Sequence, residues 1–369
     1  MKKSLILILA SMMVLTFALA GCGTGSDTDD NGADENGAEN GVAEDPTRVG
    51  LVLSTGGLGD QSFNDAAYRG LEQAEQDLGI EFDYIEPEDS AEDENALRRF
   101  AEQDYDLVIG VGFQMQDTLK EVAEDMDHIN FAIVDGGYAE IPDNVATLNF
   151  AQHEGSFLAG ALAALVTEVN TIGFMGGVES ALITQFQAGF EQGATHVNPD
   201  VDIDVRYVGD FGDIARGRET ARGQVERGAD VIYHAAGGSG TGLFEVAEDE
   251  EIYAIGVDSN QNMVAPGYVI ASMLKRVDTA VYSITESVVN DAFEGGKDYI
   301  FDLSDDGVGL TSLTDLDIEE EDAAETERIT QEQLEAIQEM KQSVTAEHAE
   351  TIEELRQQII SGEIVVDTE

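Results

Sequence analysis

The sequence is short of cysteine, tryptophan and basic residues, and each shortage limits what the protein can be. Cys22 is the only cysteine among 369 residues, so no disulfide can form within one chain and stability must come from the core. Tryptophan is absent. Basic residues number 18 against 76 acidic ones, which gives a formal net charge of −58. This charge repels nucleic acid and anionic lipid headgroups, so neither is an expected partner.

Lysine is rarer than arginine. The chain has six lysines and twelve arginines, and two of the lysines lie in the first three residues. Apolar residues still make up 42%, enough for a folded protein. An acid excess with few lysines is typical of adaptation to high salt, because salt screens the self-repulsion of the charges. We therefore expect a halophilic acidic protein, with an ordinary acidic surface as the alternative.

Sequence patterns for metal binding and nucleophilic catalysis are incomplete. The five histidines are scattered without metal-ligand spacing, and Phe157 stands where a zinc-protease pattern begun by His153 needs its second histidine. The stretch around Ser239 nearly matches G-x-S-x-G, but Thr241 replaces the last glycine. No Walker A lysine follows any glycine cluster. We expect no cofactor, no metal and no enzymatic activity, although scattered carboxylates leave hydrolysis open.

The N-terminus has the pattern of an export signal. Two lysines precede an apolar run from Leu5 to Leu19, which is too short and wrongly flanked for a persistent membrane span. The run ends in Leu-Ala-Gly-Cys, which resembles the bacterial lipobox. That resemblance implies removal of residues 1–21 and acylation of Cys22, for example with palmitate, at the extracellular face of the cytoplasmic membrane. Residues 22–47 are acidic and Gly-rich, which predicts a disordered tether.

From Arg48 onward, short β-branched runs alternate with helical periods. The runs are RVGLVLS, DLVIGVG, INFAIVD, TIGFMGG, ADVIYHAA and IYAIGVD. They form two clusters, before and after about residue 150, which predicts an α/β fold with two doubly wound parallel-sheet lobes. Ligands of such lobes bind beyond the carboxyl ends of the strands. Residues 315–361 are Glu-rich with a helical period and lack a sustained coiled-coil seam, so we expect solvated helix packed on the second lobe.

The stretch GGLGDQSFND, residues 56–65, has the glycines of a phosphate loop but not its other features. Ser62 occupies the position of the third glycine, and the carboxylate of Asp60 would repel a pyrophosphate. We expect Ser62 to cap the following helix, with Asp65 favouring its positive end. Phe63 follows in the first turn, where a phenylalanine is usually core.

A series of motifs runs in order from about Arg48 to Val366. They are GGLGDQSFNDAAYRGL, GVGFQM, FAIVDGG, NFAQHEGSFLAGALAAL, IGFMGG, FQAGFEQGA, GADVIYHAAGGSGTGLFEVA, YAIGVDSNQ, ASMLKRVDTAVY and the terminal SGEIVV. Together they resemble the Bmp family of lipoproteins, the purine-nucleoside-receptor type of binding protein. The resemblance implies a type I periplasmic-binding-protein fold, whose two lobes are joined by crossover strands. We expect lobe 1 to span 48–150 plus about 271–297, and lobe 2 to span 151–270 plus about 298–369.

The resemblance also implies a nucleoside site between the lobes. In family members a purine base stacks between aromatic rings, while carboxylates and a lysine hold the ribose. Carried over by motif, Phe63 and Phe186 are similar to the stacking pair, and Asp258 and Lys275 to the ribose-binding pair. The other binding positions implied are Asp60, Asn64, Phe113, Met115, Asp135 and Gly238.

These expectations combine into a lipid-anchored solute-binding protein. It would capture a nucleoside, with purine as the first expectation, and deliver it to the permease and ATPase subunits of an ABC importer. Three alternatives stay open on sequence grounds. The ligand could be another small polar molecule such as a sugar, free base or signalling compound; the protein could report its ligand to a membrane regulator; or it could hydrolyse the glycosidic bond.

Overall fold

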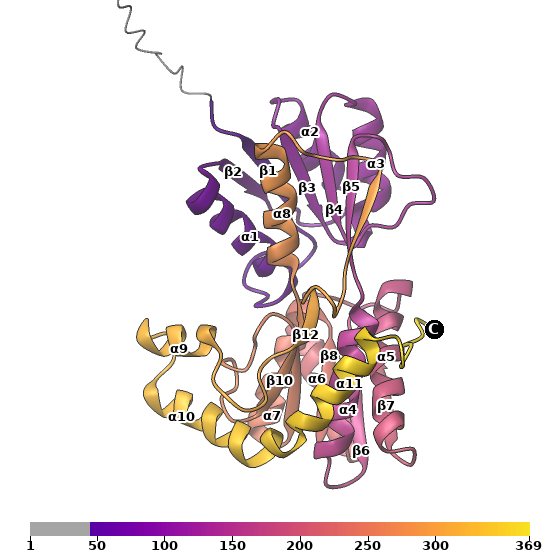
Figure 1. Cartoon of the computed structure of the whole chain (residues 1–369), viewed down its shortest axis with the longest axis vertical. Helices are drawn as coiled ribbons and strands as arrows, with labels where there is room; N and C mark the ends of the chain where they lie inside the picture. Colours follow the sequence, from indigo (N-terminus) through magenta and orange to yellow (C-terminus); the bar gives the residue numbers. More distant parts are fainter. Residues whose placement is uncertain (1–44) are drawn as a thin grey trace, which may run out of the picture. The chain divides into compact units, whose positions relative to one another are not determined.

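The computed structural model describes residues 45–369, which form two α/β lobes (Figure 1). The expected signal peptide, the acylated Cys22 and nearly all of the expected tether lie outside the described residues. Each lobe contains a six-stranded sheet with helices packed on it. The expected fold class, two parallel-sheet lobes, is confirmed.

The first lobe has an entirely parallel sheet in the order β11-β5-β4-β3-β1-β2. Its strands are β1 (Arg48–Val52), β2 (Glu81–Ile85), β3 (Leu107–Val111), β4 (Asn130–Val134), β5 (Val145–Phe150) and β11 (Lys297–Phe301). Its helices are α1 (Phe63–Leu78), α2 (Asp93–Ala101), the 3₁₀ turn η1 (Phe113–Met115), α3 (Gln116–Asp125) and α8 (Val277–Val289). The central strands β1, β3 and β4 are apolar and buried except at the first residue of β1 and of β4, because helices cover both faces.

The second lobe repeats this arrangement, with the strand order β12-β10-β9-β8-β6-β7. Its strands are β6 (Thr171–Gly176), β7 (Asp202–Tyr207), β8 (Val231–Ala235), β9 (Tyr253–Asp258), β10 (Val269–Lys275) and the antiparallel β12 (Val308–Leu310). Its helices include α4 (Gln152–Val166), α5 (Ala181–Val197), α6 (Ile214–Arg227), the 3₁₀ turn η2 (Gly237–Gly240) and α7 (Thr241–Glu250). In both lobes the order reverses between the first and third strands, which is where such folds bind ligands.

The chain passes between the two sheets after β5, after β10 and after β11. Figure 1 shows the consequence: α8, late in the sequence, lies beside α1 in the first lobe. The boundaries differ from those expected. β10 stays in the second sheet through Lys275, so the return to lobe 1 comes later than residue 271. β11 pairs with β5, so lobe 1 extends to Phe301, because that edge of the first sheet accepts a further strand.

The C-terminal segment consists of several short helices on the second lobe. They are α9 (Ile318–Glu325), α10 (Gln331–Met340), the π-helical turn η3 (Lys341–Thr345), the 3₁₀ turn η4 (Ala346–His348) and α11 (Ala349–Ile360). Apart from the buried Glu320, the glutamates of these helices are exposed, while Ile352, Leu355 and Ile359 of α11 join the main core. The segment therefore packs on lobe 2, with a buried stripe facing α4.

Glycines let α4 and α5 approach closely, and this contact predicts a stability effect. A Cβ at Gly193 would lie 1.8 Å from the backbone oxygen of Phe157, so Gly193→Ala forces the helices apart. We expect a loss of about 1–3 kcal/mol in the free energy of unfolding. Denaturant titration in concentrated salt measures it. Gly137→Ala is the control, because nothing lies within 4 Å of its Cβ position, and a loss there of equal size would contradict the packing argument.

Candidate functional site

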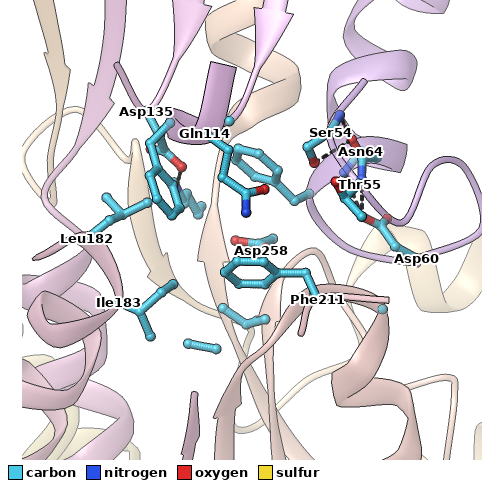
Figure 2. A pocket seen from close by; sticks show the side chains of 18 of the residues that line it. Ser54, Thr55, Asp60, Asn64, Gln114, Asp135, Leu182, Ile183, Phe211 and Asp258 are labelled. Atoms are coloured by element: carbon cyan, nitrogen blue, oxygen red, sulfur yellow. Dashed lines mark hydrogen bonds and ion pairs between the residues drawn. The ribbon is translucent and has the colours of Figure 1, made fainter. Parts of the chain in front are cut away.

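A cavity lies where the carboxyl ends of both sheets meet, and residues of both lobes line it (Figure 2). Its volume is about 70 Å³. Pockets that hold small ligands usually measure roughly 300–1,000 Å³. A nucleoside-sized ligand therefore enters only when the lobes or their side chains separate. Of the residues expected from sequence, all but Met115 line this cavity: Asp60, Phe63, Asn64, Phe113, Asp135, Phe186, Gly238, Asp258 and Lys275.

The first binding loop is held by Asp60, which caps α1. Its carboxylate accepts the backbone N–H groups of Ser62 at 2.9 Å and Asn64 at 2.8 Å. The expected cap by Ser62 is wrong, because the Ser62 side chain makes no capping bond and its hydroxyl donates to Asp258 of the other lobe. The carboxylate of Asp60, which argued against a phosphate loop, thus accepts hydrogen bonds from the free N–H groups at the start of α1.

Asn64 joins this loop to the end of β1. Its side-chain oxygen accepts the Ser54 backbone N–H at 2.9 Å, and its amide donates to Asp60 at 3.1 Å. Both Asp60 and Asn64 are buried, at 4% and 2% exposure. Because their side chains already bond within the chain, their main effect is to fix the loop that presents Phe63.

Lys275 stands at the centre of the site, at the end of β10. Its ammonium lies 2.5 Å from Asp135, and both side chains are almost completely buried. The ring centroids of Phe63, Phe186 and Phe150 lie 4.9, 5.5 and 5.0 Å from the same nitrogen. The two expected stacking residues and the expected lysine therefore meet in one place, with rings from both lobes around a cation.

Asp135 and Asp258 occupy equivalent positions in the two lobes. Each ends a parallel strand in the left-handed conformation, with φ of 63° and 64°, which aspartate tolerates better than most residues. One oxygen of Asp135, Oδ1, is buried and has no hydrogen-bond partner among residues 45–369. A buried carboxylate oxygen without a partner is costly, so it is a ready acceptor for a ligand hydroxyl.

The cavity holds more acid than base. Burial raises the pKa of Asp258 to about 6, with Lys275 and the Ser62 hydroxyl opposing the rise and Asp60 and Asp135 adding to it. Burial likewise raises the pKa of Asp60, against its backbone hydrogen bonds, and that of Asp135, against Lys275. Three carboxyl groups and one ammonium favour a neutral ligand rich in hydroxyl donors and oppose a phosphate.

The other end of the cavity contains residues that the sequence prediction missed. Phe113 of lobe 1 meets Phe211 of lobe 2 edge to face, with 6.5 Å between ring centroids. Gln114 extends into the cavity from η1 (Figure 2). Met115, which we expected to bind ligand, is instead 2% exposed and packs in the core of lobe 1, because the turn η1 directs Gln114 and Met115 to opposite sides.

Three of the missed residues obey one rule that the sequence could have revealed. Phe211 follows β7 in the turn Gly-Asp-Phe-Gly, and Ser54 and Thr55 follow β1, so all three stand at carboxyl ends of strands. The end of β1 was recognisable from the sequence. The strand β7 was not expected, because its sequence, DIDVRY, alternates charged with apolar residues.

Residues 47–367 match the Bmp family, described as "ABC transporter substrate-binding protein PnrA-like". The chain belongs to the Bmp family. Among relatives of this Bmp protein, the ABC transporter nucleoside-binding protein BmpA of Lactococcus lactis is 32% identical over 331 residues, covering 84% of this chain and 92% of the relative. The CD4+ T-cell-stimulating antigen of Listeria innocua is 34% identical over 337 residues, covering 85% of this chain and 92% of the relative.

Solved structures agree with the fold of the Bmp protein. An ABC transporter solute-binding protein of Aeropyrum pernix superposes with a TM-score of 0.81 at 31% identity, covering 88% of this chain and 94% of that one. A periplasmic binding protein of Alkaliphilus metalliredigens superposes with a TM-score of 0.57 at 15% identity and supports the fold alone. Within residues 45–369 of the Bmp protein, no helix combines the length and apolarity needed to cross a bilayer.

Proposed function

We propose that this Bmp-family substrate-binding protein captures nucleosides, with purine nucleosides preferred. The observation that carries the proposal is the Lys275–Asp135 pair beside Asp258, enclosed by Phe63 and Phe186 at the meeting of the lobes. This arrangement joins hydroxyl acceptors to flat apolar surfaces in one small space. A nucleoside has both parts, a ribose and a planar base.

The chemistry of the site suits each part of that ligand. An ionised carboxylate accepts two neighbouring hydroxyls, so Asp258 and the free oxygen of Asp135 are suited to the ribose. An aromatic ring that stacks on a base contributes about 1–3 kcal/mol, a value from nucleic-acid binders. Gly238, whose added Cβ would lie 3.3 Å from the Phe211 oxygen, leaves its backbone close to the ligand. No covalent step is needed, and we propose no catalytic residue.

Delivery to an ABC importer follows from the family, and the anchor from the sequence. We propose that residues 1–21 are removed, that acylated Cys22 holds the protein outside the cytoplasmic membrane, and that residues 22–47 act as a tether. Closure of the two lobes over the ligand would be the state that the permease and ATPase subunits respond to. The printed name of the Lactococcus lactis relative, a nucleoside-binding protein, supports this proposal.

Calorimetry against a ligand panel tests the proposal. The panel contains adenosine, guanosine, inosine, cytidine, adenine, ribose and adenosine monophosphate, titrated in concentrated salt. We expect nucleosides to bind, purines more tightly than cytidine, and the monophosphate to bind at least about tenfold more weakly because the site is acidic. Binding of ribose or adenine without nucleoside binding would favour the alternative of another small polar ligand. Chromatography after incubation should return the nucleoside intact, and released base would favour hydrolysis.

We expect Gln114 to recognise the base by hydrogen bonds to its edge. Its amide offers one donor and one acceptor into the cavity and makes no hydrogen bond that engages it elsewhere among the described residues. In Gln114→Leu, we expect discrimination between adenosine and guanosine to fall by about tenfold, since a hydrogen bond contributes about 0.5–1.5 kcal/mol. Calorimetry with both ligands measures this ratio. The control Gln116→Leu lies two residues away and does not line the cavity, so an equal change there would contradict the role of Gln114.

We also propose that the acidic surface is an adaptation to high salt. Without salt, the acidic groups that give the net charge of −58 repel one another. We expect circular dichroism to show loss of structure in dilute buffer and recovery in concentrated salt. Full structure at an ionic strength of about 0.01 M, where the Debye length is about 30 Å, would contradict the adaptation.

A further inference from the structure

Two of the four lysines that follow Cys22 are completely buried, and only Lys275 lines the ligand cavity. The other, Lys341, is 0% exposed and begins the π-helical turn η3 of the C-terminal segment. Burying an ammonium is costly unless it is paired and hydrogen-bonded, and π-helical turns occur often at functional sites. Lys341 therefore needs an explanation that the ligand site does not supply.

Lys341 belongs to an ion pair that reaches the loop after β9. Its ammonium lies 2.8 Å from Glu320 Oε2, donates to the Asp315 carbonyl at 2.9 Å, and lies 3.4 Å from Asp317. Glu320 is itself 0% exposed. Its second oxygen, Oε1, accepts the side-chain amide of Asn262 at 2.8 Å. The C-terminal segment thus holds Asn262 through the carboxylate of Glu320.

Residues 258–262, which we call the latch loop, bond directly to the first lobe, and of these residues only Asp258 also lines the cavity. Gln261 donates its amide to the Gln61 carbonyl at 3.1 Å, and its oxygen accepts the Val257 backbone N–H at 2.8 Å. Ser259 accepts a bond from Arg69 of α1 at 2.9 Å. Asp258 at the start of the loop accepts the Ser62 hydroxyl. The three bonds that join this loop to residues 61, 62 and 69 cross between the lobes and form only when the lobes are together, whereas the Gln261–Val257 bond lies within lobe 2.

We propose that Lys341 and Glu320 are positioning residues: they fix the latch loop, and the latch loop holds the closed cleft and slows ligand release. The C-terminal segment touches no residue of lobe 1 through this network and acts only through Asn262 and the loop. Bonds present only in the closed state shift the equilibrium toward closure, which lowers the dissociation rate. The proposal that Lys341 and Glu320 position the latch loop does not depend on the proposed function, whereas the proposal that the loop retains ligand rests on it.

The test variant removes the network without leaving a fully buried charge, because the remaining Asp317 carboxylate is 30% exposed. Lys341→Met alone would strand the buried Glu320 carboxylate and risks unfolding the protein. The double variant Lys341→Met/Glu320→Leu replaces the pair by apolar groups of similar volume, which proteins often tolerate. The control Lys297→Met/Glu294→Leu removes an exposed pair of the same residue types, 2.6 Å apart.

The first measurement is amide hydrogen exchange without ligand, in concentrated salt. In the double variant we expect the amides of Val257 and Gln261, both bonded to side chains of this region, to exchange at least about tenfold faster. The amides inside β8 should keep their protection, and the control should match wild type. Unchanged exchange at Val257 and Gln261, with only a lowered melting temperature, would overturn the positioning role.

The second measurement is the dissociation rate of the nucleoside that wild type binds most tightly. We expect it to rise about tenfold in the double variant, with the association rate nearly unchanged, because a lost closed-state bond acts on release. Faster exchange with an unchanged dissociation rate would overturn the link to retention. If wild type binds no nucleoside, the proposed function fails while the exchange measurement still decides the positioning role.

Discussion

Asp258→Ala is expected to weaken nucleoside binding by about a hundredfold or more. The carboxylate is placed to accept two ribose hydroxyls, and each bond to a charged acceptor contributes about 1.5–3 kcal/mol. Calorimetry of wild type and variant in concentrated salt measures the loss. Asp291→Ala is the matched control, because Asp291 adopts the same left-handed backbone, with φ of 52°, on the surface. Wild-type affinity in Asp258→Ala would remove this residue from the site.

The same carboxyl group makes binding depend on pH. Its pKa in the free protein is about 6, raised by burial. A ligand that donates to the ionised form lowers that pKa, so binding below pH 6 must release a proton. Affinity is therefore expected to fall as pH drops through about 6, by at most about tenfold per pH unit for this one group. Asp258→Asn should bind weakly with most of this dependence gone, and an unchanged slope would assign it to other groups.

Lys275→Met is expected to weaken binding and also to destabilise the fold. It leaves Asp135 and Asp258 buried without their cation, which costs about 3–5 kcal/mol near neutral pH. The pKa of each acid then rises further above its unfolded value. The folded state consequently binds more protons than the unfolded chain, so stability decreases as pH rises through the folded pKa values. Denaturant titration should show a larger loss at pH 8 than at pH 5.

A second variant separates stability from binding at this lysine. Lys275→Met/Asp135→Asn removes both charges of the buried pair, keeps a residue that tolerates the left-handed backbone at 135, and should recover much of the lost stability while nucleoside binding stays weak. Recovery of binding in this variant would show that neither residue contacts the ligand. An equal loss of stability at both pH values in Lys275→Met would contradict the role of the buried carboxylates.

Six of the interior strands were predictable because strands that are buried on both faces have nearly continuous apolar sequences. The six apolar runs correspond to β1, β3, β4, β6, β8 and β9, which lie inside the sheets between helices. The six other strands were not among the expected runs. The strands β2, β7 and β11 stand at sheet edges, where one side meets water, and their sequences EFDYI, DIDVRY and KDYIF mix charge with apolar residues. The strands β5 and β10 lie inside the sheets, but polar residues interrupt their apolar runs, and the edge strand β12 has only three residues.

Part of the site was predictable because the residues of the family motifs lie where the predicted strands end. Asp60, Asp135 and Asp258 each follow an apolar run or glycine turn, and the resemblance to the Bmp family added Phe186 and Lys275 from distant segments. The resemblance did not show which of two neighbours in GVGFQM meets the cavity, since that depends on the direction of one 3₁₀ turn. It also could not place Phe211, whose strand carried no recognisable pattern.

The sequence by itself determined the fold class, the two lobes and the acid excess, because period and composition are local properties of the chain, whereas most expected positions of the site came from the resemblance to the Bmp family. Only the tertiary structure decided what each polar group does. Ser62 was expected to cap its own helix, yet its hydroxyl reaches Asp258 while Asp60 makes the cap. Lys341 lies in a segment that looked merely solvated, yet it is buried against Glu320 and bonded through it to the latch loop. Ser62 and Asp258 are 196 residues apart, and Asn262 and Glu320 are 58 apart, so these hydrogen bonds form only once the tertiary structure brings the segments together.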